Sequence, residues 1–280
     1  MKIALVVNLN NSKAREVSDT LISEFQKEGA DVLMLSEAKD ISAKHNIIYY
    51  ETYEELFIAC DIAVLAGGDG TIMHSARYAA IYSKSIIGVN LGRVGFVAEL
   101  TPEDTQEFSR IARGDFKLQS RMVLDISVVD EHGEEKSYLA INDAVISRGA
   151  LSRIIDLSVV VGDKNIGTYR ADGLLFSTPT GSTAYALSAG GPIIDPKLNL
   201  IELTPVCPHT LADNRTVLFS DDTLLSVTCK SSDTSYLTVD GQVSVPLNST
   251  DKVVVKRSKY NLSMITLKEL NFYKIVGEKL

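Results

Sequence analysis

One stretch decides how this chain folds: Val64-Leu65-Ala66-Gly67-Gly68-Asp69-Gly70-Thr71-Ile72-Met73-His74. The apolar run at its start is typical of a buried strand, and the residues after Gly70 favour a helix. Glycines between the two let a ligand approach the main chain without a Cβ in the way. The first N–H groups of a helix have no partner inside it and attract phosphate. The stretch therefore predicts a phosphate-binding turn between a strand and a helix.

A single carboxylate, that of Asp69, lies inside this turn. A bare carboxylate repels phosphate, so we expect Asp69 to meet a metal ion or a substrate hydroxyl. The structural alternative is an ordinary tight turn, because Gly, Asn and Asp all tolerate turn dihedrals. Taken alone, the stretch leaves both interpretations open.

The composition excludes several classes of protein. The chain has 280 residues, of which 45% are hydrophobic and 23% charged, as in soluble globular proteins. A net charge of −8 disfavours binding to nucleic acid. The three cysteines are widely spaced, which fits neither a disulfide framework nor a zinc site. No apolar run approaches the ~18 residues of a membrane span, so we expect a cytoplasmic protein that binds neither nucleic acid nor a membrane.

Strands and helices alternate over the first hundred residues. Strands are predicted at 2–7, 31–35, 61–66 and 85–89, and helices at 12–28, 54–60 and 71–82. Such alternation indicates a parallel sheet with helical crossovers. Ligands of these sheets bind beyond the carboxyl ends of the strands. The turn at Gly67–Thr71 follows one strand, and a second glycine-bearing loop, 90–96, follows the next.

The pattern changes after a predicted helix at 103–113. From Lys117 onward, short β-rich runs are separated by turn clusters, which predicts a second, mainly antiparallel domain that begins between residues 101 and 118. The segment Gly162–Thr168 starts like a P-loop, but Thr168 stands where the lysine belongs, and it predicts a hairpin.

Residues 172–192 carry the most informative pattern of the second domain. A strand at 174–177 runs into hydroxyl-bearing residues and small residues, and Gly190-Gly191-Pro192 closes the segment. Small residues let a ligand lie against the backbone, hydroxyls donate and accept hydrogen bonds, and Tyr185 offers a stacking face. The structural alternative is a Ser/Thr-rich helix cap, although a cap needs only one hydroxyl.

Two further polar turns allow a structural and a functional interpretation. Asn142-Asp143 follows a predicted strand at 138–141, and a plain turn pair is its default interpretation. Asp240-Gly241-Gln242 is most simply a hairpin turn.

Taken together, these motifs resemble the NAD kinase family. The resemblance covers nearly the whole chain, in the family's order, and rests on the Gly-Gly-Asp-Gly-Thr turn, the loop 90–96, Asn142-Asp143, the run 172–192 and Pro208-His209-Thr210-Leu211. Gly-Gly-Asp-Gly alone also resembles diacylglycerol and sphingosine kinases and phosphofructokinases. The run 172–192 is the specific part.

The resemblance implies a fold and a reaction. The fold is an α/β N-terminal domain with a parallel, Rossmann-like sheet, plus a mainly antiparallel, β-rich C-terminal domain. Residues 1–100 would carry the phosphate turn, residues 101–255 would bind NAD, and residues 256–280 would pack back on the first domain. The reaction is transfer of the terminal phosphoryl of ATP to the 2′-hydroxyl of the adenosine ribose of NAD, which gives NADP.

The resemblance also implies roles for residues. Asp69 is similar to the family's catalytic aspartate, which would orient the ribose hydroxyl and take its proton. Asn142 and Asp143 resemble the pair that holds ribose and adenine, and Asp143 is one methylene shorter than the Glu commoner there. The remaining expected NAD- or nucleotide-binding residues are Gly68, Gly70, Thr71, His74, Arg153, Arg170, Asp172, Thr183, Ala184, Tyr185, Ser188 and Gln242. The loop Asp213–Thr216 departs from the family's usual ending.

ATP and NAD are both anionic, as is the protein, so we expect Mg²⁺ or another divalent cation to arrive with ATP. The resemblance further suggests a homodimer or homotetramer, and leaves open polyphosphate as a second donor. Two rival functions are a lipid kinase, which the run 172–192 disfavours, and a non-catalytic NAD(P)-binding sensor, which has no use for the Asp69 carboxylate among phosphates.

Overall fold

The computed structural model describes residues 1–92, 97–149, 153–210, 214–231, 234–268, 272 and 276–277. The chain forms two compact units, one of residues Met1–Ser120 with Leu262–Leu280 and one of Arg121–Asn261. The first unit extends past the predicted boundary at residue 100, because α5 (Thr105–Arg113) buries Phe108 and Ile111 in its core.

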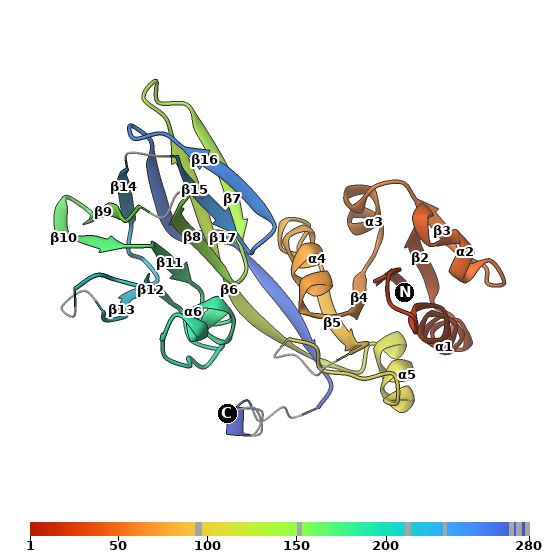
Figure 1. Ribbon diagram of the computed structural model, residues 1–280. Helices are drawn as coiled ribbons and strands as arrows, with labels where there is room; N and C mark the ends of the chain where they lie inside the picture. Colours follow the sequence, from red (N-terminus) through yellow and green to blue (C-terminus); the bar gives the residue numbers. More distant parts are fainter. Residues whose placement is uncertain are drawn as a thin grey trace. The chain divides into compact units, whose positions relative to one another are not determined.

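The first unit is a parallel sheet covered by helices on both faces (Figure 1). The strand order is β3-β2-β1-β4-β5, and residues Ser263 and Met264 of β17 (Lys252–Thr266) pair in parallel with β5. Its elements are β1 (Lys2–Val7), α1 (Ala14–Lys27), β2 (Asp31–Leu35), η1 (Ser36–Ala38), α2 (Lys39–Ser42), β3 (Ile48–Tyr50), α3 (Tyr53–Ala59), β4 (Ile62–Gly67), α4 (Asp69–Ile81) and β5 (Ser85–Asn90).

The core of the first unit follows from the continuous apolar strands. Alternate residues of β1 and β4, such as Ile3, Leu5 and Val64, pack under α1 and α5. The residues between them, such as Ala4 and Leu65, are equally buried on the other face. A strand that is apolar at every position is buried on both faces, which confirms the predicted α/β arrangement.

The second unit contains antiparallel sheets. One sheet, β13-β12-β11-β8-β15-β16, has six strands, and β10-β9-β14-β17 form another, in which β6 pairs with β17 and β7. Its elements are β6 (Lys117–Val129), β7 (Glu135–Ala140), β8 (Asp143–Arg148), β9 (Ile155–Val161), β10 (Lys164–Ala171), β11 (Gly173–Ser177), η2 (Gly181–Thr183), α6 (Tyr185–Ser188), β12 (Leu200–Val206), β13 (Val217–Ser220), β14 (Leu225–Lys230), β15 (Ser235–Val239) and β16 (Val243–Leu247).

Both faces of the six-stranded sheet are used. Leu174 and Phe176 of β11 point into a large apolar core, to which Leu157 and Val227 of the other sheet contribute. The opposite face carries Leu175, which packs against Ala186 of the short helix α6. The segment 181–188 therefore lies over the face on which Ser177, two residues from Leu175, also projects.

Candidate functional site

The Gly-Gly-Asp-Gly turn joins β4 to α4. Gly68 caps the helix in an extended conformation (φ −93°, ψ 179°), and its carbonyl accepts the N–H groups of Thr71 and Ile72 at 3.0 and 3.2 Å. The helix begins at Asp69, two residues before its predicted start. An acidic side chain in the first turn of a helix is stabilising, which favours this earlier start.

The glycines of this turn differ in whether the surrounding structure requires a residue without a Cβ. A Cβ on Gly67 would lie 2.5 Å from Oγ1 of Thr71, so the first turn of α4 requires glycine there. A Cβ on Gly68 or Gly70 would meet nothing within 4 Å. Glycine inside a helix costs about 0.5–1 kcal/mol relative to alanine, and steric contact within the described chain gives no reason for it at Gly70. Among the residues that the structure describes, none occupies the space where these two Cβ atoms would lie.

The Asp69 carboxylate is half-buried at the start of α4. Its Oδ1 atom is buried and accepts no hydrogen bond from the described part of the chain. A buried acceptor without a donor is costly and calls for an explanation, of which a bound ligand is one.

Loops from three neighbouring strands meet at this edge of the sheet. The N–H of Asn8, after β1, donates to the Ala66 carbonyl at 2.9 Å, and the N–H of Leu91, after β5, donates to the Gly67 carbonyl at 3.2 Å. The carboxyl ends of parallel strands are where such sheets bind ligands. Of the second glycine loop, Asn90–Gly92 is thus placed beside the first, whereas 93–96 lies outside the described residues.

His74 lies one turn further along α4 and is half-buried. Its ring makes an edge contact with Tyr53 of α3 (centroids 4.9 Å apart), which in turn stacks on Tyr78. His74 therefore belongs to an aromatic cluster between α3 and α4.

In the second unit, Asn142 lies in the turn between β7 and β8, and Asp143 is the first residue of β8. The carboxylate of Asp240 accepts three consecutive backbone N–H groups of this turn, from Ile141 (2.9 Å), Asn142 (2.7 Å) and Asp143 (3.0 Å). Asp240 follows β15 in a hairpin turn with Gly241, as predicted, and both have positive φ (49° and 65°). The sequence gives no sign that its carboxylate reaches a turn almost a hundred residues earlier.

The carbonyl side of the same turn is held by residues after β11. The N–H of Thr178 donates to the Asn142 carbonyl at 2.9 Å, and its hydroxyl donates to the Ile141 carbonyl at 2.6 Å. A Cβ on Gly181 would lie 2.2 Å from the Asn142 carbonyl oxygen. The hydroxyl of Ser182 is likewise occupied, with Pro179 and Ile194. Thr178 and Ser182 are two of the hydroxyl-bearing residues in the run 172–192, where the sequence suggested contacts with a ligand. In the structure, their hydroxyls make hydrogen bonds within the protein and stabilise the fold.

Two acceptors are left buried by this arrangement. The Oδ1 atom of Asn142 is buried and has no hydrogen-bond partner among the described residues. Asp143 is only 6% exposed, and burial, together with the negative charges of Asp240 and Glu202, raises its pKa to about 7. Buried amide and carboxylate oxygens of this kind are suited to accept hydrogen bonds from a hydroxyl or amino group.

Glu202 was not predicted from the sequence. It is fully buried on β12, its Oε1 accepts the Thr204 hydroxyl at 2.8 Å, and burial raises its pKa. A Cβ on Gly191 would lie 2.1 Å from Oε1, which explains one of the two glycines that close the run 172–192. An acidic residue inside an otherwise β-rich segment is the only signal that the sequence offers.

Arg148 and Asp172 form a two-pronged ion pair. Nε of Arg148 lies 2.7 Å and Nη2 3.3 Å from the two carboxylate oxygens of Asp172, which raises the pKa of Arg148. Both belong to neighbouring strand ends, since the Arg148 N–H also donates to the Asp172 carbonyl. Asp172 is thus fixed in orientation by a residue that the sequence had not singled out.

The other expected binding residues of the second unit are more accessible. Thr183 and Ala184 are half-buried in the segment that covers the sheet face, with Tyr185 (46% exposed) and Ser188 beside them. Arg153, Arg170 and Gln242 are exposed. Residues 211–213, 269–271, 273–275 and 278–280, which include parts of predicted motifs and of the predicted C-terminal tail, lie outside the described residues.

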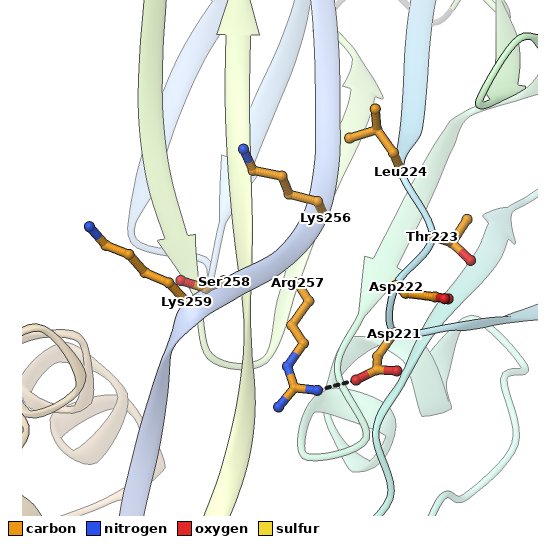
Figure 2. Close-up of a pocket in the computed structure, with 8 residues that line it drawn as sticks. All are labelled: Asp221, Asp222, Thr223, Leu224, Lys256, Arg257, Ser258 and Lys259. Carbon is orange, nitrogen blue, oxygen red and sulfur yellow. Dashed lines mark hydrogen bonds and ion pairs between the residues drawn. The ribbon is translucent and has the colours of Figure 1, made fainter.

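A shallow surface hollow of the second unit contains none of the predicted site residues (Figure 2). Arg257 pairs there with Asp221. Its lining consists of Asp221, Asp222, Thr223, Leu224, Lys256, Arg257, Ser258 and Lys259. The described residues contain no group of three or more His, Cys, Asp or Glu side chains that could hold a metal ion, and none of their helices is long and apolar enough to cross a membrane.

Comparisons with known proteins give the family. Residues 3–115 match the family model of the ATP-NAD kinase N-terminal domain, and residues 141–267 match that of the ATP-NAD kinase C-terminal domain. An NAD kinase of Geobacter sulfurreducens is 37% identical over 100% of this chain and 98% of its own length. One of Heliobacterium modesticaldum is 41% identical over 79% of this chain and 78% of its own length.

Solved structures share the fold. Yeast NADH kinase complexed with NADH has a TM-score of 0.88 at 23% identity, over 100% of this chain and 87% of that one. An NAD kinase from Archaeoglobus fulgidus in complex with ATP has a TM-score of 0.76 at 22% identity, over 99% and 98%. With both family models matched in order and full-length relatives above 30% identity, the chain belongs to the NAD kinase family.

Proposed function

We propose that this protein transfers the terminal phosphoryl of ATP to the 2′-hydroxyl of the adenosine ribose of NAD. The bond that forms joins the 2′-oxygen to the γ-phosphorus, and the bond that breaks joins that phosphorus to the bridging oxygen of ADP. The hydroxyl proton passes to a carboxylate or to solvent.

The observation that carries this proposal is the Asp69 carboxylate. It stands at the N-terminus of α4, beside Gly68 and Gly70. Among the described residues, a Cβ on either glycine would meet nothing within 4 Å, and Oδ1 of Asp69 is buried without a donor. The helix N-terminus attracts phosphate, and the carboxylate accepts the hydrogen bond of the attacking hydroxyl. A carboxylate is a weak base for an alcohol, so the main contribution of Asp69 is to position the oxygen.

The second unit supplies groups suited to a nucleoside. The buried Asn142 Oδ1 accepts a hydrogen bond from an amino or hydroxyl group, and the Asp143 carboxylate accepts one from a ribose hydroxyl. Tyr185, nearly half exposed, offers a ring for stacking. Thr183, Ala184, Ser188, Asp172, Arg153, Arg170 and Gln242 complete the proposed set of NAD contacts, with Thr71 and His74 on α4.

The triphosphate needs a counter-charge, because the protein itself carries a net charge of −8. We expect Mg²⁺ or another divalent cation to enter with ATP as part of the substrate and to neutralise charge on the transferring group. We further expect the enzyme to act in the cytoplasm as a homodimer or homotetramer.

The direct test is to incubate the protein with NAD, ATP and Mg²⁺ and to follow NADP with an NADP-specific dehydrogenase. NADP formation above a protein-free blank supports the proposal. Formation of a phosphorylated lipid but no NADP would favour a lipid kinase. Saturable NAD binding without turnover in the presence of ATP or polyphosphate would favour a non-catalytic sensor.

A further inference from the structure

We propose that Asp240 is a positioning residue of the nucleotide site, which acts by holding the Asn142–Asp143 turn in its binding geometry. The proposal rests on the proposed function, since it takes Asn142 and Asp143 as residues that bind NAD. Asp240 itself touches neither substrate nor reacting atoms in this account.

The first argument is the number of backbone groups that Asp240 fixes. Three successive N–H groups, those of residues 141, 142 and 143, converge on its two carboxylate oxygens at 2.7–3.0 Å. Hydrogen bonds to a charged acceptor are roughly twice as strong as neutral ones. A single side chain therefore determines the orientation of three peptide planes, and with them the direction of the Asn142 and Asp143 side chains.

The second argument is that the hairpin turn that carries Asp240 is itself held by hydrogen bonds. Asp240 begins a tight turn with positive φ, its own N–H donates to the Asp143 carbonyl at 2.9 Å, and the Gln242 N–H closes the turn onto Val239 at 2.9 Å. On the far side, Thr178 holds the two carbonyls of Ile141 and Asn142. The turn is thus fixed from both sides by residues that are distant in sequence.

The third argument is electrostatic. Asp240 and Glu202 are the charged groups that act on Asp143, and with its burial they raise its pKa to about 7. Asp143 accordingly changes charge in the physiological range. If ionised Asp143 binds the ribose, kcat/KM for NAD rises with pH through the pKa of the free enzyme.

The variant Asp240→Asn separates these effects. Asparagine tolerates the positive φ and keeps the size of the side chain. Its NH₂ group, however, replaces one of the two accepting oxygens, so at least one backbone N–H of the turn faces another donor and loses its acceptor. We expect KM for NAD to rise by about tenfold or more, with KM for ATP unchanged. Because one negative charge beside Asp143 is removed, the inflection of kcat/KM for NAD also moves to lower pH.

The matched control is Asp130→Asn. Asp130 also accepts two backbone N–H groups in a hairpin turn, from His132 and Glu134, both at 2.9 Å, but it lies in the exposed turn between β6 and β7. We expect this variant to keep the wild-type KM for NAD and the wild-type pH profile.

A second variant, Thr178→Val, guards against misfolding of Asp240→Asn. It removes a hydroxyl bond from the same turn without changing any charge, so KM for NAD rises while the inflection stays in place. The proposal is overturned if Asp240→Asn folds and keeps the wild-type KM for NAD, whatever the result for Thr178→Val. It is also overturned if Asp240→Asn lowers stability, raises KM for NAD and KM for ATP by the same factor, and leaves the pH inflection of kcat/KM for NAD unchanged. Absence of NADP formation by the wild type would instead refute the proposed function.

Discussion

Asp143 and Glu202 occupy directly paired positions in the six-stranded sheet, on the two strands that flank Ser177. Ser177 of β11 pairs with Asp143 of β8 and with Glu202 of β12. Side chains at directly paired positions project to the same face of a sheet. Two buried carboxylates therefore share one face, and each has a raised pKa.

This arrangement makes the stability of the free protein depend on pH. A carboxyl whose pKa is raised on folding stabilises the folded state fully below its unfolded pKa, and that contribution is lost as pH rises through the folded pKa. For Asp143 the loss extends from the ordinary aspartate pKa of 3.8 up to its folded pKa of about 7. For Glu202 it begins at 4.5 and extends upward.

We expect Glu202→Gln to flatten this dependence. The amide fills the same space and carries no charge, so the variant gains on the order of 1–3 kcal/mol relative to wild type at pH 8, and little at pH 4. Thermal unfolding at pH 4, 6 and 8 measures the difference. Glu131→Gln, on an exposed side chain in the β6–β7 turn, is the control and shows no such trend. An equal loss of stability at all three pH values would contradict this account.

Gly70→Ala tests whether open space at the phosphate turn serves a ligand. The added Cβ meets none of the described residues within 4 Å, and alanine favours the helix by about 0.5–1 kcal/mol, so we expect the variant to be at least as stable as wild type. We expect kcat/KM for ATP to fall about tenfold or more, because the methyl group obstructs the approaching phosphates.

Gly67→Ala is the complementary variant. Its Cβ would lie 2.5 Å from Thr71 Oγ1, so we expect destabilisation of about 1–3 kcal/mol. A melting temperature for each variant, combined with steady-state kinetics, separates the two roles. Wild-type ATP kinetics for Gly70→Ala would show that no phosphate approaches there.

Arg148→Lys tests the orientation of Asp172. Lysine keeps the positive charge but cannot make the two-pronged contact of a guanidinium. We expect KM for NAD to rise about three- to tenfold with an unchanged melting temperature. Arg110→Lys is the control, because Arg110 binds Asp115 and Glu107 on the first unit in a similar partly exposed network. If both variants bind NAD as wild type does, Asp172 does not depend on Arg148.

Local sequence patterns were sufficient for much of the fold. The alternation of apolar strands and helices predicted the parallel sheet of the first unit, and Gly162-Asp163 predicted the β9–β10 hairpin. The length of β17, which runs from Lys252 to Thr266, did not follow from the sequence. Polar residues such as Lys256 and Lys259 alternate there with buried ones, a weak signal on a half-buried strand.

The contacts around Asn142 and Asp143 could not be predicted from the sequence. They depend on the register of β8 with β11 and on a turn almost a hundred residues away, and neither follows from local propensity. Asp240 carried the signature of a hairpin turn, and that prediction was confirmed. Its carboxylate had a second use that only the tertiary structure reveals.

The most direct test of the central claim uses ATP labelled in the γ-phosphoryl, together with NAD and Mg²⁺, and compares the wild type with Asp69→Asn. The wild type is expected to place the label on the 2′-position of the adenosine ribose. Asp69→Asn is expected to lower kcat by about 100- to 10,000-fold and to leave the Kd for NAD largely unchanged. Asp61→Asn, just before β4 at the opposite end of the strand, keeps the wild-type rate. Label at any other position, or a wild-type rate for Asp69→Asn, would contradict the account.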